Sequence, residues 1–274
     1  MSKGQILCLG DSWATEFGLI STVPQELRKR GFDPIPLPVT AKGILTTNLV
    51  AEIALKTIAT AVKGYATASG STTKALFLSA GGNDIRLKVD HDPLTNQPIV
   101  DPATGFKMER RILDLMIRPK VPGMSPLAAI DQTRLDQFLT SIEVNYKTIL
   151  DVIVLAAAGK FTIITHGYAH PYTDDAHWLG LYQSICKPPK NWSETDGAII
   201  MRKLIDDLNL SISKVTATFH GAVVHLNFCT TIDRLVTDSA GEYKKAWLDE
   251  LHLTRNLGYP KVVDQMISQV PALQ

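Results

Sequence analysis

The chain has 274 residues, and its 28 Lys and Arg residues balance 27 Asp and Glu residues. This length is sufficient for a sizeable buried core, and a net charge near zero argues against nucleic acid or an anionic membrane as the main partner. The three cysteines are too widely spaced for a disulfide framework or a zinc site. We therefore expect neither a metal nor a cofactor.

The N-terminal apolar segment is too short for the core of a signal peptide, and no run of about 18 apolar residues could span a membrane. The expected location is the cytoplasm, with export after removal of a signal segment as the alternative. Because no Pro-, Gly- or Ser-rich linker divides the chain, residues 1–274 are expected to form one domain.

Apolar strand patterns alternate with helical patterns along the chain, separated by crossovers of about 10 to 25 residues. This alternation predicts a parallel sheet with helices on both faces. Strands are expected at residues 5–9, 34–37, 74–79, 161–165 and 222–227. Helices are expected at residues 13–30, 47–64, 131–159 and 201–219, and from about residue 260.

Two stretches break this rhythm. The segment at about 86–126 contains two Asp-Pro turns, at residues 92–96 and 101–105, and predicts a small β excursion from the sheet. The segment at about 166–195 is rich in aromatic residues, which favours a cover over a site. Its aromatic residues are Tyr168, Tyr172, Trp178, Tyr182 and Trp192.

The first apolar strand ends abruptly at Gly10, which Asp11 and Ser12 follow. In open α/β sheets, ligands bind at the carboxyl ends of the strands, so Ser12 is a candidate nucleophile. A serine nucleophile needs a base, a carboxylate that orients the base, and donors for an oxyanion. His252 and Asp249, three residues apart, could supply the first two.

Oxyanion donors are expected in loops that follow predicted strands. The backbone N–H groups of Ser12 and Gly43 and the side-chain amide of Asn83 could converge on one oxygen. Asn83 lies in a Gly-Gly-Asn-Asp loop directly after the strand at 74–79, where only a glycine-permissive backbone fits.

These residues resemble the SGNH or GDSL hydrolases. The four blocks of that family stand in order as Gly10-Asp11-Ser12, Gly43, Gly81-Gly82-Asn83-Asp84 and Asp249-Glu250-Leu251-His252. The resemblance implies a three-layer α/β/α, flavodoxin-like fold with a mostly parallel five-stranded sheet. It also implies ester or acyl hydrolysis, with Ser12 as nucleophile, His252 as base, Asp249 as its partner, and Ser12, Gly43 and Asn83 as oxyanion donors.

The chain departs from the family pattern at two positions beside the motifs. Trp13 replaces the usual aliphatic residue after the serine, and Leu253 replaces the common proline after the histidine. We interpret Asp11, Asp84 and Glu250 as supporting residues, with Glu250 as the alternative partner of His252. Trp13, Tyr168 and Trp178 are expected to contact the substrate.

Several other polar residues could be read as functional. His170, Asp174, Asp175 and His177 lie in a loop rather than on one helical face, so their spacing fits no standard metal site. A structural role is the simpler interpretation of His166, which ends a predicted strand.

The resulting hypothesis is serine-dependent hydrolysis of carboxylic esters through an acyl-enzyme on Ser12, with a small-molecule ester as the partner. The same machinery could instead serve a carbohydrate O-acyl esterase, an acyltransferase, a thioesterase or a lysophospholipase. A hypothesis of another class is a catalytically silent binding protein. No pattern names the acyl length or the oligomeric state.

Overall fold

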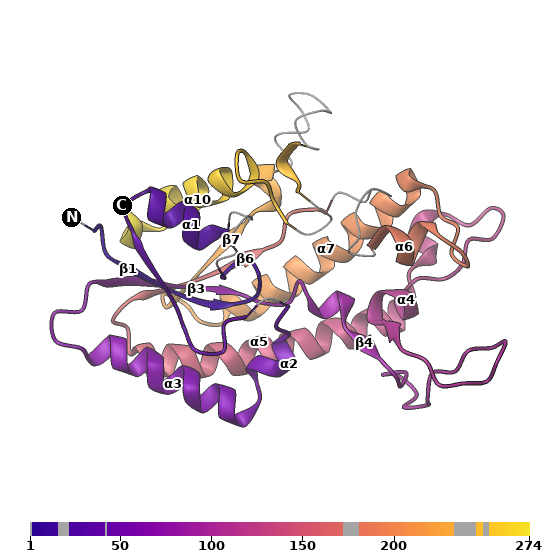
Figure 1. Ribbon diagram of the computed structural model, residues 1–274, viewed down its shortest axis with the longest axis horizontal. Coiled ribbons are helices and arrows are strands. Elements are labelled where there is room, and N and C mark those ends of the chain that lie inside the picture. Colours follow the sequence, from indigo (N-terminus) through magenta and orange to yellow (C-terminus); the bar gives the residue numbers. More distant parts are fainter. Residues whose placement is uncertain (1, 16–21, 42, 172–180, 233–244, 249–251) are drawn as a thin grey trace.

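The fold is built around a five-stranded sheet in which every neighbouring pair of strands is parallel (Figure 1). The computed structural model describes residues 2–15, 22–41, 43–171, 181–232, 245–248 and 252–274. The strand order is β2-β1-β3-β6-β7, with β1 next to the centre. The strands are β1 (Gln5–Gly10), β2 (Asp33–Pro36), β3 (Thr73–Ser79), β6 (Thr162–Gly167) and β7 (Val223–Asn227).

Helices cover both faces of this sheet. The helices α1 (Val23–Lys29) and α10 (Gly258–Gln269) pack together on one face. The other face carries α3 (Glu52–Thr67), α5 (Gln132–Ala157) and α7 (Glu194–Ala217), which pack against one another. This arrangement confirms the three-layer α/β/α class predicted from the sequence.

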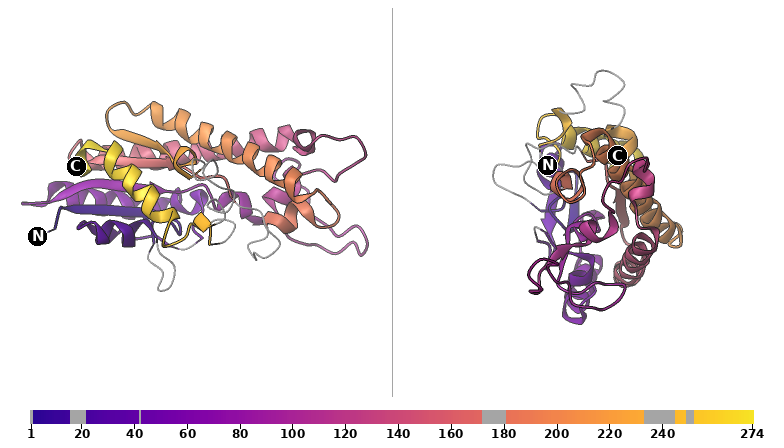
Figure 2. Two further views of the ribbon diagram at one scale, coloured as in Figure 1. Left: turned by 90° about the horizontal axis from the view of Figure 1, so that it is seen from above. Right: turned by 90° about the vertical axis from the view of Figure 1, so that its right-hand side faces the viewer.

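The helices α5 and α7 continue past the carboxyl edge of the sheet and form an elongated projection (Figures 1 and 2). The two antiparallel strands of the β excursion pack in this projection together with short helices, so the predicted excursion is present. The elements of the projection are η1 (Asp84–Arg86), β4 (Lys88–Val89), β5 (Arg110–Arg111), α4 (Ile112–Met116), η2 (Pro126–Ala129) and α6 (Leu181–Cys186).

The two turns of the excursion have the geometry that the sequence predicts. The backbone N–H of Asn96 donates to the carbonyl of Asp92, and that of Gly105 donates to the carbonyl of Asp101, at 2.8 and 2.7 Å. Asn96 and Gly105 both have positive φ, +55° and +70°. Asn and Gly are the residues that tolerate this conformation most readily.

Three helix predictions were wrong at their ends, and one of them is the helix expected at 201–219, which begins seven residues earlier as α7 (Glu194–Ala217). The first helix begins at Val23 rather than directly after Trp13, and Pro24 lies in its first turn, where a missing N–H costs nothing. The helix expected at 47–64 is divided into α2 (Thr46–Leu49) and α3, and it continues past Gly64 to Thr67. In α3, packing of Ile58 and Val62 outweighs the low helix propensity of the glycine.

Near the C-terminus, the short helix η3 (Pro271–Leu273) packs against β3. None of the helices within the described ranges is long and apolar enough to cross a membrane.

Gly10, the last residue of β1, is required by both its conformation and its surroundings. Its φ is +128°, and a Cβ added there would lie 1.7 Å from the carbonyl oxygen of Ser79 on β3. The ends of β1 and β3 therefore approach each other more closely than any side chain permits. This contact fixes the backbone that leads into Ser12.

We predict that Gly10→Ala lowers the free energy of unfolding by about 3 kcal/mol or more, because the strain of a positive φ adds to the steric overlap with Ser79. Gly70→Ala is the matched control, since Gly70 also has a positive φ (+72°) but open space around a Cβ. The control should lose only about 1 kcal/mol. Urea denaturation measures both values, and equal losses would contradict the steric argument.

Candidate active site

Ser12 and His252 meet at the carboxyl edge of the sheet although 240 residues separate them. The Oγ atom of Ser12 and the Nε2 atom of His252 lie 2.9 Å apart, which is hydrogen-bond distance. Both side chains are largely buried, with 5% and 6% of their surfaces exposed. A neutral imidazole in this position can accept the hydroxyl proton of the serine.

His252 is held by the backbone that flanks it. The N–H of Leu248 donates to the carbonyl of His252 at 2.8 Å, and the N–H of Thr254 donates to that of Ala246 at 2.7 Å. Leu253 is fully buried, so an apolar side chain anchors the position where the resemblance led us to expect proline. Asp249, the expected partner of His252, and Glu250, the alternative, lie outside the described residues.

The carboxylate of Asp11 lies beneath the serine and joins three strands. Its Oδ1 accepts hydrogen bonds from the backbone N–H of Trp13 (3.0 Å) and the hydroxyl of Ser79 (2.6 Å), and its Oδ2 accepts one from the hydroxyl of Tyr168 (2.9 Å). Nε2 of His166 lies 2.9 Å from the Ser79 hydroxyl and extends the network to β6. These bonds use the carboxylate to position the loop, as expected for a supporting residue.

Two of the ionisable groups of this network, Asp11 and His166, respond to burial in opposite directions. Burial raises the pKa of the Asp11 carboxyl, against the effect of the hydrogen bonds from Ser79, Trp13 and Tyr168. Burial lowers the pKa of His166 to about 3, so its ring is neutral at physiological pH. Ser79 was not among the residues predicted for the site, although a hydroxyl at the end of an otherwise apolar strand is a usable signal.

Trp13 and Tyr168 pack in an aromatic layer rather than lining an open wall. The ring of Trp13 stacks on His166 and Phe228, with centroid distances of 5.2 and 6.1 Å, and meets Tyr168 and Tyr259 edge to face. Only 3% of Trp13 and 7% of Tyr168 is exposed. Their placement favours support of the Asp11 network over the expected contact with substrate. Trp178, the third residue expected to contact substrate, lies outside the described residues.

Asn83 and Gly43 belong to loops that follow β3 and β2, the two strands on either side of β1. Asn83 directly precedes η1 beyond the end of β3, and its side-chain amide donates a long hydrogen bond, 3.5 Å, to the carbonyl of Ile44. Gly43 has a φ of +73° in the loop after β2, and the N–H of Ala41 ties that loop to the carbonyl of Gly10 at 3.1 Å. The Asn83 amide and the Gly43 loop therefore lie together beside the strand that carries Ser12.

Asp84 fastens the Asn83 loop to α2. Both carboxylate oxygens of Asp84 lie 3.1 Å from the backbone N–H of Thr46, and Oδ1 accepts the Thr46 hydroxyl at 2.7 Å. The side-chain amide of Asn145 on α5 donates in turn to that hydroxyl oxygen at 2.9 Å. Burial raises the pKa of Asp84 to about 6, against the opposing effect of the hydrogen bonds from Thr46.

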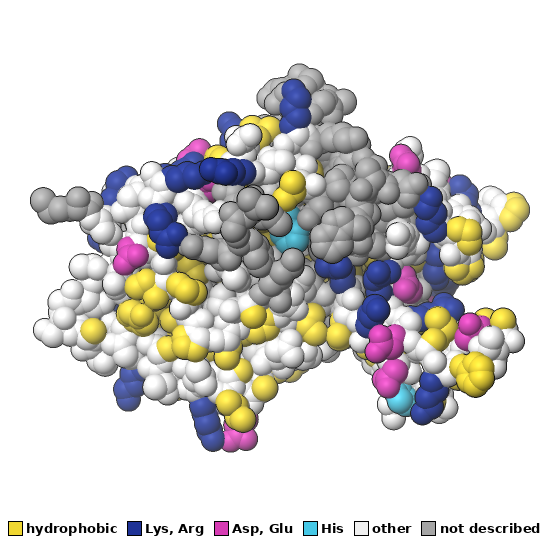
Figure 3. All heavy atoms as spheres, in the orientation of Figure 1, with side chains coloured by type: hydrophobic (Ala, Val, Ile, Leu, Met, Phe, Trp, Pro, Cys, Tyr) yellow, Lys and Arg dark blue, Asp and Glu magenta, His cyan; other side chains and the backbone are white. Residues whose placement is uncertain are grey.

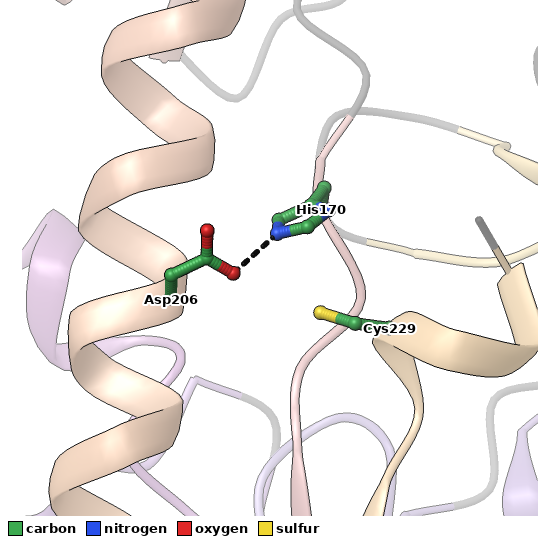
Figure 4. A group of neighbouring side chains, drawn as sticks. All are labelled: His170, Asp206 and Cys229. Atoms are coloured by element: carbon green, nitrogen blue, oxygen red, sulfur yellow. Dashed lines mark hydrogen bonds and ion pairs between the residues drawn. The ribbon is translucent and has the colours of Figure 1, made fainter.

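A cluster of His170, Asp206 and Cys229 lies between α7 and the ends of β6 and β7 (Figure 4). Nε2 of His170 pairs with Asp206 at 2.7 Å, and Sγ of Cys229 lies 2.8 Å from the carbonyl oxygen of Tyr168. A thiol can donate to that carbonyl, whereas a metal-bound thiolate would be repelled by it. The contacts therefore support an anchor for the Tyr168 backbone rather than a metal centre. Asp174, Asp175 and His177 lie outside the described residues.

Comparison with known proteins identifies the fold. No protein-family model and no curated protein matches the chain. Among solved structures, the chain is similar to Axe2, an acetylxylan esterase from Geobacillus stearothermophilus, with a TM-score of 0.51, 11% identity, and coverage of 98% of this chain and 95% of the other. The chain therefore has the fold of the SGNH or GDSL hydrolases.

Two further solved structures are similar over nearly the whole chain. A member of the lipolytic G-D-S-L family from Veillonella parvula has a TM-score of 0.44 and 13% identity, with 97% of each chain covered. A GDSL-like lipase from Bacteroides thetaiotaomicron has a TM-score of 0.43 and 13% identity, with 98% of this chain and 88% of the other covered. Of these three structures, only the acetylxylan esterase has a TM-score above 0.5.

The raised pKa of Asp84 predicts a measurable pH dependence of stability. In the unfolded chain the carboxyl keeps its ordinary pKa of 3.8. Between pH 3.8 and about pH 6, the folded chain therefore binds more protons than the unfolded chain. The stabilisation from Asp84 is therefore complete below pH 3.8 and is lost as the pH rises through 6. The free energy of unfolding relative to Asp84→Asn should fall by about 2–3 kcal/mol between pH 4 and pH 7.

Denaturant titrations of the two proteins at several pH values measure this difference. A difference in the free energy of unfolding that stays constant or increases with pH would show that burial does not raise the pKa of the Asp84 carboxyl.

Proposed function

We propose that this protein hydrolyses carboxylic esters through an acyl-enzyme on Ser12. The observation that carries the proposal is the 2.9 Å contact between Ser12 Oγ and His252 Nε2 at the carboxyl edge of the sheet. The fold shared with an acetylxylan esterase is consistent with this chemistry, although fold alone does not define function.

In the first half-reaction, His252 takes the proton of the Ser12 hydroxyl while Oγ attacks the ester carbonyl. The carbonyl oxygen becomes an oxyanion, which the N–H groups of Ser12 and Gly43 and the amide of Asn83 stabilise. The tetrahedral intermediate then collapses, and His252 gives its proton to the departing alkoxide. The products are the free alcohol and an acyl ester of Ser12.

In the second half-reaction, His252 takes a proton from a water molecule, whose oxygen attacks the acyl carbon. The same donors stabilise the second oxyanion, and His252 returns the proton to Ser12 Oγ as the acid departs. Asp249 is proposed to accept the Nδ1–H of His252 and to stabilise the imidazolium that forms twice in each cycle.

We predict that Ser12→Ala abolishes both the hydrolysis of p-nitrophenyl esters and covalent labelling by a fluorophosphonate probe. Ser211→Ala is the control, because Ser211 is an equally buried serine on α7. Mass spectrometry of the labelled protein should locate the probe on Ser12. Undiminished turnover in Ser12→Ala would refute the proposal, and a wild-type protein that is neither labelled nor active would favour a silent binding protein.

We predict that Asn83→Ala lowers kcat by about 10²–10³-fold with little change in KM, because the oxyanion that its amide stabilises exists only near the transition state. Asn48→Ala, at an exposed asparagine on α2, should leave both constants unchanged. Steady-state kinetics on one short ester measures both variants. A loss below threefold, or one confined to KM, would remove Asn83 from the oxyanion site.

A further inference from the structure

A cavity of about 310 Å³ lies in the projection beyond the carboxyl edge of the sheet. It is lined by residues of η1, β4, α4 and the N-terminal half of α5, and by Thr47 of α2. In the space-filling view, apolar side chains gather on the surface between α2 and β4 (Figure 3). The apolar walls of the cavity are formed by Leu87, Val89, Ile112, Leu115, Met116 and Phe138.

The charged and amide side chains at this cavity already have partners in the protein. The guanidinium of Arg134 binds both carboxylate oxygens of Asp92, each at 2.6 Å, and the amide of Gln137 donates to the carbonyl of Pro93 at 2.7 Å. Asp84 is engaged by Thr46. A sugar would require hydrogen-bonding groups directed at it, whereas these walls offer mainly apolar surface. The cavity therefore suits an uncharged hydrocarbon chain.

The cavity begins next to the proposed oxyanion site. Asp84, which lines the cavity, follows Asn83 directly in the chain, and Leu87 and Val89 continue the same wall. Adjacent Cα atoms lie about 3.8 Å apart, so the backbone of Asn83, whose side-chain amide is the proposed oxyanion donor, is close to the cavity border. A carbonyl oxygen held by that amide would place one of its substituents near the cavity.

The position of His252 indicates which substituent this is. His252 must protonate the leaving oxygen, and it lies six residues before the first residue of α10, the helix that packs with α1 on one face of the sheet. The cavity borders α5, on the opposite face. The alcohol part of the ester thus points toward the α10 face, and the acyl part points toward α5.

On the basis of the proposed function, we infer that this cavity binds the acyl chain and that the substrates are esters of medium-chain fatty acids. A cavity of about 150 Å³ accommodates one benzene ring, so 310 Å³ has room for roughly ten to twelve carbon atoms. Each methylene buried there should raise kcat/KM by about fourfold until the cavity is filled.

The test is a series of p-nitrophenyl esters from acetate to hexadecanoate. In the wild-type protein, kcat/KM should rise to a maximum near decanoate and then fall. Leu115→Trp fills the cavity and should lower the ratio of kcat/KM for decanoate to that for acetate by at least about tenfold. Val89→Trp fills it from β4 and replaces Leu115→Trp if that variant does not fold. Leu155→Trp, at an exposed leucine at the far end of α5, should leave the ratio unchanged.

A second readout separates this inference from the proposed function. Binding of decanoate to Ser12→Ala, followed by calorimetry, should be saturable and should be lost when Leu115→Trp is added. If esters are hydrolysed with a flat chain-length profile, or if Leu115→Trp leaves the ratio unchanged, the acyl cavity is refuted while ester hydrolysis stands. If no ester is hydrolysed, the proposed function fails, and decanoate binding alone decides whether the cavity takes a hydrocarbon chain.

Discussion

The buried carboxylate of Asp11 is the constraint on which the candidate site depends. It accepts hydrogen bonds from Trp13, Ser79 and Tyr168, which follow or end β1, β3 and β6, three consecutive strands of the sheet. Each donor would cost about 1–3 kcal/mol if it were buried without a partner. One charge therefore fixes the relative positions of three strand ends, and the backbone at Ser12 with them.

Removing this carboxylate from water costs free energy. The surrounding aromatic layer strengthens the hydrogen bonds that offset this desolvation. Trp13, His166 and Phe228 stack above one another, so water is kept from the carboxylate and its hydrogen bonds operate in a medium of low dielectric constant. His166 stays neutral there, and it adds a hydrogen-bonding partner for Ser79 without adding a second buried charge. The residues on either side of Ser12 are thus fixed by hydrogen bonds and by ring packing, which favours a single orientation of its hydroxyl toward His252.

The helices and strands that local sequence patterns specify could be predicted from the sequence. The contacts between side chains far apart in the sequence could not. The strand endings at Gly10 and at Ser79 are readable because the apolar runs stop there, the first at a glycine with positive φ and the second directly before a glycine-rich loop. The start of α1 could have been read from Thr22 and Pro24, which mark a helix N-terminus. By contrast, the pairing of Ser79 with His166 joins residues 87 positions apart, and no spacing rule relates them.

The same limit applies to the candidate site. Ser12, Asn83 and His252 could be nominated because a known motif order connects them, whereas residue type alone suggested that Trp13 would contact substrate. Its ring instead fills the layer between β6 and α10, since an indole beside a buried carboxylate gains more from packing than from exposure. Sequence patterns identify reactive groups better than they identify what lies beneath them.

The lengths of the elements explain why a cavity forms where it does. The 26 residues of α5 and the 24 of α7 span about 39 and 36 Å, whereas the six residues of β1 span only about 20 Å. The helices must therefore overhang the sheet, and the inner faces of the overhang have no strands to pack against. The segments 84–130 and 181–193 supply that packing from short helices and a two-stranded ribbon. Such pieces cannot fill the space as closely as a sheet would, and the cavity that remains has mainly apolar walls. One of its lining residues, Asp84, follows Asn83 directly in the chain. Substitutions in the cavity walls can therefore change the shape of the cavity without changing the strands that position Ser12.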